Sequence, residues 1–299
     1  MLASIPSPSN NVLEIGPLDV HYYGILIAIG IAIALTLVRR RYEHFGGDPD
    51  LVDRVLVWAV VAGFVGARLA YASTHLHRFE GRPEAILFIW EGGLAFFGGL
   101  TFGAITAIVL VARWTDGGRF GDFPRFADAA APGIPLAQAI GRWGNYFNQE
   151  LFGTPSDLPW AVEIDPGNRP EQYQDAATFH PTFLYESLYN FLVVALLLLI
   201  ERRTELRRGS LIFVYLIFYG IGRFLLELIR TDTTFRILGI SRNGWVAILA
   251  AAGGAVALRW WQQREGPPVG ATTSPDDTAA PSAAADTADR TPDAASRDA

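Results

Sequence analysis

Cysteine and lysine are absent from this chain of 299 residues. Without cysteine the protein has no disulfide, no thiol nucleophile of its own and no cysteine-ligated metal. No cluster of side chains with the spacing of a metal site is recognisable either, so we expect no bound metal. All 24 Lys and Arg positions are arginines, and we draw no conclusion about function from this.

The end of the chain lacks the residues that build a core. From about residue 265 onward there is no aromatic side chain and only one valine, among many Pro, Ala, Thr and Asp residues. Such a segment cannot bury enough apolar surface to fold. We expect a folded domain over 1–264 and a disordered tail over 265–299. Because the tail holds part of the acidic residues, the net charge of −6 says little about partners.

Long apolar runs dominate the remainder. A helix needs roughly 20 apolar residues to cross a bilayer core about 30 Å thick. Seven segments approach this length, at 20–38, 51–73, 94–112, 127–148, 184–200, 210–229 and 244–261. They predict an all-α integral membrane protein with about seven transmembrane helices. Pro132, Pro135 and Gln138 interrupt the fourth segment, for which a buried or re-entrant helix is the alternative.

Arginines are unevenly distributed among the connections between these segments. With the N-terminus outside, the inner connections hold about twice as many arginines as the outer ones. The positive-inside rule therefore predicts an outer N-terminus and an inner C-terminus, with the tail in the cytoplasm.

Polar residues of several segments would lie at one depth in this topology, near the outer leaflet boundary. They are Arg68, Arg142 and Arg223 in the second, fourth and sixth segments, and His21, Tyr22, Tyr23 and residues 92–99 at the outer ends of two others. A charge inside a membrane costs at least about 2.5–3.5 kcal/mol and usually marks function. A polar site is therefore predicted just below the outer surface.

Helical spacing places these polar residues on single faces. In the sixth segment they recur every three or four positions, at Tyr215, Tyr219, Arg223, Glu227 and Arg230. The fourth segment has the same spacing at Gln138, Arg142, Asn145 and Asn148. Each set predicts one polar stripe on an otherwise apolar helix.

Structural roles are also open for these residues. Arg223 and Glu227 have the spacing of a helical ion pair. Arg68 lies where an arginine can extend to the interface, and Asn145 and Asn148 would serve equally as hydrogen bonds between helices.

Two intramembrane arginines on different helices favour a functional interpretation. Like charges are not brought together for stability alone, and two guanidiniums facing one cavity form a forked site for phosphate. In an outer leaflet the available phosphate belongs to a phospholipid headgroup.

The stretch GRWGNYFNQELFG at 141–153 resembles the signature of the bacterial prolipoprotein diacylglyceryl transferases. Further motifs of that family are matched in order by HYYG at 21–24, WEGGLAFFGG at 90–99, HPTFLYE at 180–186 and YGIGRFLLELIRTD at 219–232. The resemblance covers about residues 15–260 and omits only the ends of the chain.

The resemblance implies transfer of diacylglycerol from phosphatidylglycerol to the lipobox cysteine of a prolipoprotein signal peptide, with release of glycerol phosphate. It implies a multi-pass protein of the bacterial inner membrane with its active site at the outer face. Neither a metal nor an organic cofactor is implied, and nothing supports a nucleic-acid partner. The nucleophilic thiol belongs to the substrate, which is consistent with a cysteine-free enzyme.

Roles follow residue by residue as hypotheses from the resemblance. The expected catalytic residues are Arg142, Arg223, Glu150 and Tyr23. The expected substrate-binding residues are Arg142, Asn145, Asn148, Gly153, Glu227, Arg230, Arg68 and His180. Asn145 and Asn148 would bond the headgroup or orient Arg142, Glu150 and Glu227 would hold the guanidiniums, and Gly153 would permit a tight turn after the fourth segment.

One position departs from the family pattern. The glycine-rich motif that the family has in its third helix, matched here at 90–99, commonly contains a histidine before its final Gly-Gly. This chain has Phe97 at that position. The role of a base for the thiol cannot be carried over, which leaves His21 and His180 as candidate bases, or no base if the arginines lower the pKa of the thiol. An inactive lipid-binding relative and an anion or lipid transporter are the alternative functions. A transporter would need polar residues on the inner side, where most segments are apolar.

Overall fold

The computed structural model describes residues 4–8, 10–16, 18–88, 92–116, 120–231, 236–264 and 266–269. The predicted tail lies outside the described residues except for 266–269, whose backbone pairs with the 206–208 connection. Trp90, Glu91 and Asp232 of the quoted motifs also lie outside the described residues.

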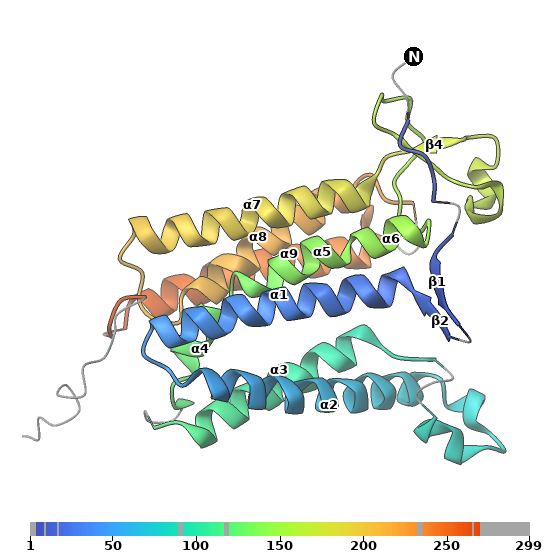
Figure 1. The fold of residues 1–299 in the computed structure, drawn as a ribbon. Helices are drawn as coiled ribbons and strands as arrows, with labels where there is room; N and C mark the ends of the chain where they lie inside the picture. The colour runs from blue at the N-terminus through green and yellow to red at the C-terminus, as the bar shows by residue number, and fades with distance from the viewer. Residues whose placement is uncertain are drawn as a thin grey trace, which may run out of the picture.

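Long antiparallel helices make up the body of the protein (Figure 1). Five described helices are long and apolar enough to cross a membrane: α1 (Tyr22–His44), α2 (Pro49–Thr74), α3 (Phe96–Trp114), α7 (Thr182–Arg203) and α9 (Arg242–Gln262). Helix α8 (Leu211–Glu227) has 17 residues and lies among them. The prediction of a helical membrane protein is confirmed by these elements.

Local chemistry explains several helix starts. The Asp48 side chain accepts a hydrogen bond from the amide of Asp50, and Pro49 occupies the first turn of α2. The Ser241 hydroxyl caps α9 by accepting from the amide of Gly244.

The fourth apolar segment is not one continuous helix. It contains α4 (Phe123–Ala130), α5 (Gly133–Gly141) and α6 (Trp143–Phe147), so the prediction of one continuous helix over 127–148 is wrong. Pro132 separates the first two pieces because it lacks a backbone N–H and crowds the preceding turn. Helix α5 packs between α1 and α7, as expected of the interrupted, buried alternative.

Within the described residues, three short antiparallel hairpins accompany the helices. They are β1 (Val12–Ile15) with β2 (Leu18–His21), β3 (Val162–Glu163) with β4 (Thr178–Phe179), and β5 (Arg236–Ile237) with β6 (Ile240–Ser241). Figure 1 shows β1, β2 and β4 at the end of the bundle where α1 begins and α6 lies, whereas α4 lies at the opposite end.

Glycines set the closest helix contacts. A Cβ atom added at Gly66 of α2 would lie 2.7 Å from the carbonyl oxygen of Gly98 in α3. One added at Gly220 of α8 would lie 2.4 Å from the carbonyl oxygen of Ala247 in α9. The pairs α2–α3 and α8–α9 are therefore held at backbone contact, as is usual where small residues join membrane helices.

Two adjacent glycines of α9 test this packing. A Cβ at Gly254 would lie 2.9 Å from the carbonyl oxygen of Phe213, whereas one at Gly253 would meet no atom within 4 Å. Gly254→Ala should lower the free energy of unfolding by about 1–3 kcal/mol through overpacking. Gly253→Ala should be neutral or stabilising by at most about 1 kcal/mol. Thermal unfolding of both variants in one detergent measures the difference, and equal midpoints would contradict backbone contact between α8 and α9.

Candidate active site

A cavity of about 520 Å³ lies between α1, α3, α5, α6, α8 and α9. The polar side chains that line it are Tyr23, Gln138, Arg142, Asn145, Tyr219, Arg223, Arg230 and Asn243. Part of the remaining wall is apolar and consists of Ile27, Ile31, Phe96, Phe97 and Val246. One cavity thus combines several cations with an apolar surface, as a charged headgroup with acyl chains requires.

The cavity brings together the predicted residues Arg142, Arg223 and Arg230 around a carboxylate that the prediction missed. Glu186 of α7 is 4% exposed. Its Oε2 contacts Nε of Arg142, and its Oε1 lies 3.7 Å from Nη1 of Arg223 and 3.4 Å from Nη1 of Arg230. Arg142 lies at the junction of α5 and α6, whereas Arg223 and Arg230 belong to the polar stripe of the sixth segment, and Glu186 is the point where the three arginines meet.

A second carboxylate holds Arg223 from the other side. Oε2 of Glu227 lies 2.9 Å from Nη2 of Arg223, and the Ser241 hydroxyl donates to Oε1 of Glu227 at 2.7 Å. The predicted ion pair between Arg223 and Glu227 is present. Among the described residues of this cluster, three arginines face the two buried carboxylates Glu186 and Glu227, which gives the cluster a net positive charge.

Arg142 is oriented through a chain of amides. Its Nη1 donates to Oδ1 of Asn145 at 3.3 Å, and Nδ2 of Asn145 donates to Oε1 of Glu150 at 2.8 Å. Asn148 also donates to Oε1 of Glu150, at 3.3 Å. Asn145 thus contacts Arg142 as expected, whereas Asn148 and Glu150 lie outside the cavity and Glu150 reaches the arginine only through Asn145.

Tyr23 lines the cavity, in agreement with its predicted place. Its ring packs on α6 at Gly144, where an added Cβ would lie 3.0 Å or less from three ring atoms. Glycine is required at this position because the tyrosine ring occupies the space of a side chain.

Arg68 does not line the cavity, contrary to expectation. Its side chain is buried, and its guanidinium donates to the five carbonyl oxygens of Ala85, Ile86, Phe88, Gly92 and Gly93. An arginine has five N–H groups, so every donor is used on backbone. Neither lipid phosphate nor the interface is available to this side chain.

His180 and His21 do not line the cavity either. His180 lies in the connection that leads into α7, and its Nδ1 is 3.2 Å from the hydroxyl of Tyr185 in the first turn of that helix. The candidate bases from the sequence are therefore not at the cavity, while Phe97 is one of its lining residues.

The tight turn after the fourth segment does not depend on Gly153. Gln149 and Leu151 adopt the positive φ values, 49° and 57°, while Gly153 has none. Gly153 is instead crowded, because an added Cβ would lie 2.8 Å from Cβ of His180 and 3.0 Å from the carbonyl oxygen of Ile229. Its amide donates to the carbonyl of His180, so this glycine lets three segments cross.

Glu186 could have been found from the sequence. It stands within the HPTFLYE motif and is the only acidic residue of the apolar segment 184–200. A carboxylate inside a membrane segment needs a cationic partner, and the polar stripes of two other segments contain arginines.

A comparison with protein families shows to which family the chain belongs. The family model for prolipoprotein diacylglyceryl transferase matches residues 10–260. The chain belongs to this family. Residues that the family resemblance singled out, Arg142, Asn145 and Arg223, are those that the structure brings to one cavity.

Curated relatives of the transferase family agree with the match. A phosphatidylglycerol–prolipoprotein diacylglyceryl transferase of Frankia alni is 44% identical over 253 residues, which cover 83% of this chain and 65% of that relative. Two proteins of Streptomyces coelicolor with the same activity in their names are 43% and 45% identical over 251 residues each. These matches cover 83% of this chain, and 78% and 71% of the two relatives. The chain thus spans slightly less than two thirds of the Frankia alni relative.

Removal of the central carboxylate tests its role in stability. Glu186→Gln keeps the shape of the side chain but leaves three guanidiniums without their shared counter-charge, which should cost about 3–5 kcal/mol of unfolding free energy. Glu84→Gln is the control, because Glu84 is 57% exposed and lies 3.9 Å from Arg82. The control should change stability by at most about 1 kcal/mol. Chemical denaturation in detergent measures the unfolding free energy of both variants. A Glu186→Gln variant as stable as the control would refute the role of Glu186 as the shared counter-charge of the three arginines.

Proposed function

We propose that this protein transfers the diacylglyceryl group of phosphatidylglycerol to the lipobox cysteine thiol of prolipoprotein signal peptides. The observation that carries the proposal is the meeting of Arg142, Arg223 and Arg230 at one cavity with a net positive charge. The names of the relatives and the membership of the family support the same reaction.

The cavity suits a phospholipid at both of its ends. Arg142 and Arg223 offer planar N–H forks for the oxygen atoms of one phosphate. Phe96 and Phe97 are 70% and 53% exposed while also lining the cavity, so its apolar side is open to the membrane. The glyceryl carbon that reacts would lie between these two regions, next to Tyr23 and Asn145.

The reaction forms one bond and breaks one. The sulfur of the acceptor cysteine bonds to the glyceryl carbon next to the phosphate, and the carbon–oxygen bond to that phosphate breaks. Its electron pair stays on the phosphate oxygen, and glycerol phosphate leaves. Arg142 and Arg223 stabilise the negative charge that grows on this oxygen. Stabilisation of developing charge by fixed donors is usually the largest single contribution to catalysis.

The proton of the thiol leaves before or during attack. Phe97 cannot accept it, and neither His21 nor His180 lines the cavity. The net positive charge of the site lowers the pKa of a cysteine thiol placed there, and the thiolate then forms with loss of its proton to water. The arginines would thereby serve both the nucleophile and the leaving group.

We also propose the number of membrane spans and the orientation of the chain. Seven spans with an outer N-terminus would place the cavity at the outer face of the bacterial inner membrane, where both substrates meet. The excess of arginines in the connections at the other end of the bundle supports this orientation. The domain from 1 to 264 carries the site, and the tail from 265 to 299 would lie in the cytoplasm.

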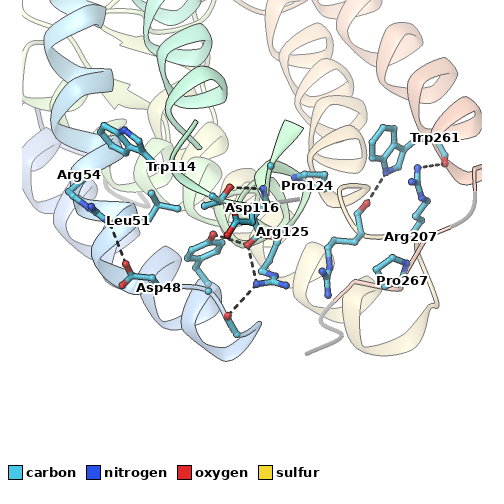
Figure 2. A pocket seen from close by; sticks show the side chains of 17 residues that line it. Asp48, Leu51, Arg54, Trp114, Asp116, Pro124, Arg125, Arg207, Trp261 and Pro267 are labelled. Carbon is cyan, nitrogen blue, oxygen red and sulfur yellow. Dashed lines mark hydrogen bonds and ion pairs between the residues drawn. The ribbon is translucent and has the colours of Figure 1, made fainter. Parts of the chain in front are cut away.

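Transport of anions is less well supported. A transporter needs polar groups along a path through the membrane. Beside the arginines the wall of the cavity includes Ile27, Ile31 and Ala137 as well as the polar Gln138 and Tyr219. The cavity shares no lining residue with the cavity of about 590 Å³ at the other end (Figure 2), so no continuous path joins the two.

Transfer of labelled diacylglycerol from phosphatidylglycerol to a lipobox peptide tests the proposal with purified protein. Arg142→Ala and Arg223→Ala should each lower the rate by about 100-fold or more, since each removes a donor to the leaving phosphate. Arg142→Lys should recover only part of the transfer rate that Arg142→Ala loses, because lysine keeps the positive charge but lacks the planar pair of N–H donors. Arg113→Ala is the control, as Arg113 is exposed at the far end of α3. A folded wild type that binds phosphatidylglycerol without transfer would instead indicate an inactive lipid-binding relative.

A further inference from the structure

A small pocket of about 30 Å³ adjoins the cavity of the candidate active site, between α5, α7 and α8. Helix α7 packs against both of the other helices (Figure 1). The residues that line both the pocket and the cavity are Gln138, Arg142, Tyr219 and Arg223. The residues that line the pocket alone are Glu186, Tyr189, Asn190, Gly222 and Leu226. The pocket therefore adjoins the ion pairs of Glu186 from outside the cavity.

Each of the three helices has a neutral polar residue four positions from a charged one. The pairs are Gln138 and Arg142 at the end of α5, Asn190 and Glu186 in α7, and Tyr219 and Arg223 in α8. Helices α5 and α8 run toward the end of the bundle where α1 begins, and α7 runs away from it (Figure 1). The neutral residues therefore form one layer, about 6 Å farther from that end than the charged layer.

The neutral layer has hydrogen-bonding groups that the protein itself does not use. Asn190 and the Tyr219 hydroxyl have no hydrogen-bond partner among the described residues, and Gln138 has only one, the Tyr215 hydroxyl at 3.3 Å from its Oε1. The unused atoms are not enclosed, so they face open space. A polar group inside a helical bundle is costly without a hydrogen bond, so this layer requires a further partner.

The charged layer also has donors to spare. Arg142 pairs through Nε with Glu186 and through Nη1 with Asn145, which uses two of the five N–H groups of a guanidinium. The remaining N–H groups face the cavity and the pocket, because Arg142 lines both. The pocket thus has donors on its charged side and amide oxygen atoms on its neutral side.

Tyr189 closes the pocket as a wall. Its hydroxyl donates to the carbonyl of Phe218 at 2.6 Å, so it does not compete for a ligand. A Cβ atom added at Gly222 would overlap the Tyr189 ring, so the ring packs directly on the backbone of α8. The small size of the pocket is therefore fixed by an aromatic ring whose position the helix contact determines.

Water fits both the size and the chemistry of this pocket. A volume of about 30 Å³ holds roughly one or two water molecules, and a buried water needs two to four polar partners. Water accepts from a guanidinium and donates to an amide oxygen at the same time, whereas an anion can only accept. A lipid headgroup or a peptide side chain is too large for the space.

We propose that the pocket binds ordered water, which accepts hydrogen bonds from Arg142 and Arg223 and donates them to Asn190 and Gln138. The inference rests on the proposed function and deepens it. With their inner N–H groups held by this water, the guanidiniums keep the other N–H groups directed at the phosphate of the leaving group. Asn190 is then a positioning residue that acts through the water and never contacts the lipid.

A crystal structure of the wild type that resolves ordered water tests the site directly. We expect water within hydrogen-bonding distance of Asn190 and of Arg142 or Arg223. A rearranged side chain that fills the pocket would overturn the proposal. So would a chloride ion, recognised by its exchange for bromide.

The variant Asn190→Leu tests the positioning role, because leucine has nearly the shape of asparagine but forms no hydrogen bond. The kcat for diacylglyceryl transfer to a lipobox peptide should fall about tenfold, since misplaced donors no longer meet the charge that grows in the transition state. The KM for phosphatidylglycerol should change by less than about twofold, because Asn190 does not line the cavity. Asn190→Ser should keep most of the rate, as its hydroxyl still binds water.

Asn168→Leu is the matched control, because Asn168 is exposed in the connection between β3 and β4. It should transfer as the wild type does. A folded Asn190→Leu variant with the kcat of the wild type, or an Asn190→Ser variant as slow as Asn190→Leu, would overturn the positioning role. Should Asn190→Leu not fold, the structure of the wild type decides. Absence of transfer by the wild type would refute the proposed function, whereas the structure tests the water site in either case.

Discussion

The ion pairs around Glu186 are the constraint on which the rest of the cavity depends. A guanidinium in an apolar environment needs either a counter-charge or a full set of hydrogen-bond acceptors, and a buried carboxylate needs cations or donors. Glu186 lies on α7, Arg142 at the junction of α5 and α6, and Arg223 on α8, so the same contacts that satisfy the charges also fix these elements relative to one another. Among the described residues of this cluster, the two carboxylates do not balance the three arginines.

The interruption of the fourth apolar segment makes this arrangement possible. A straight helix over 127–148 would carry Arg142 and Asn145 on one face. The breaks at Pro132 and Arg142 instead give short pieces, and the chain then turns back at Gln149 and Leu151. Polar groups of one short stretch can therefore contact α1, α7 and the cavity at the same time.

Sequence patterns predicted the apolar helices and the meeting of Arg142, Asn145 and Arg223, because hydrophobic length and helical spacing report on faces and depth. They did not predict which partner each charge would choose. Glu186 was missed since spacing within one helix says nothing of contacts between helices. Gly153 was assigned to a turn, but its need for glycine comes from three segments that cross at that point. The break into α4, α5 and α6 could be suspected from the prolines, whereas the direction of the chain after each break depends on tertiary packing.

Arg68 bears on how arginines inside membrane helices are interpreted. Its guanidinium satisfies five backbone carbonyls from residues 85 to 93, all from the connection between α2 and α3. Lysine has three donors and glutamine two, so either replacement would leave buried carbonyls without a partner. The number and planar geometry of the N–H groups therefore restrict this position to arginine as strictly as phosphate binding would. In this protein, intolerance to substitution at an intramembrane arginine does not by itself distinguish a residue that holds the substrate from one that holds the chain.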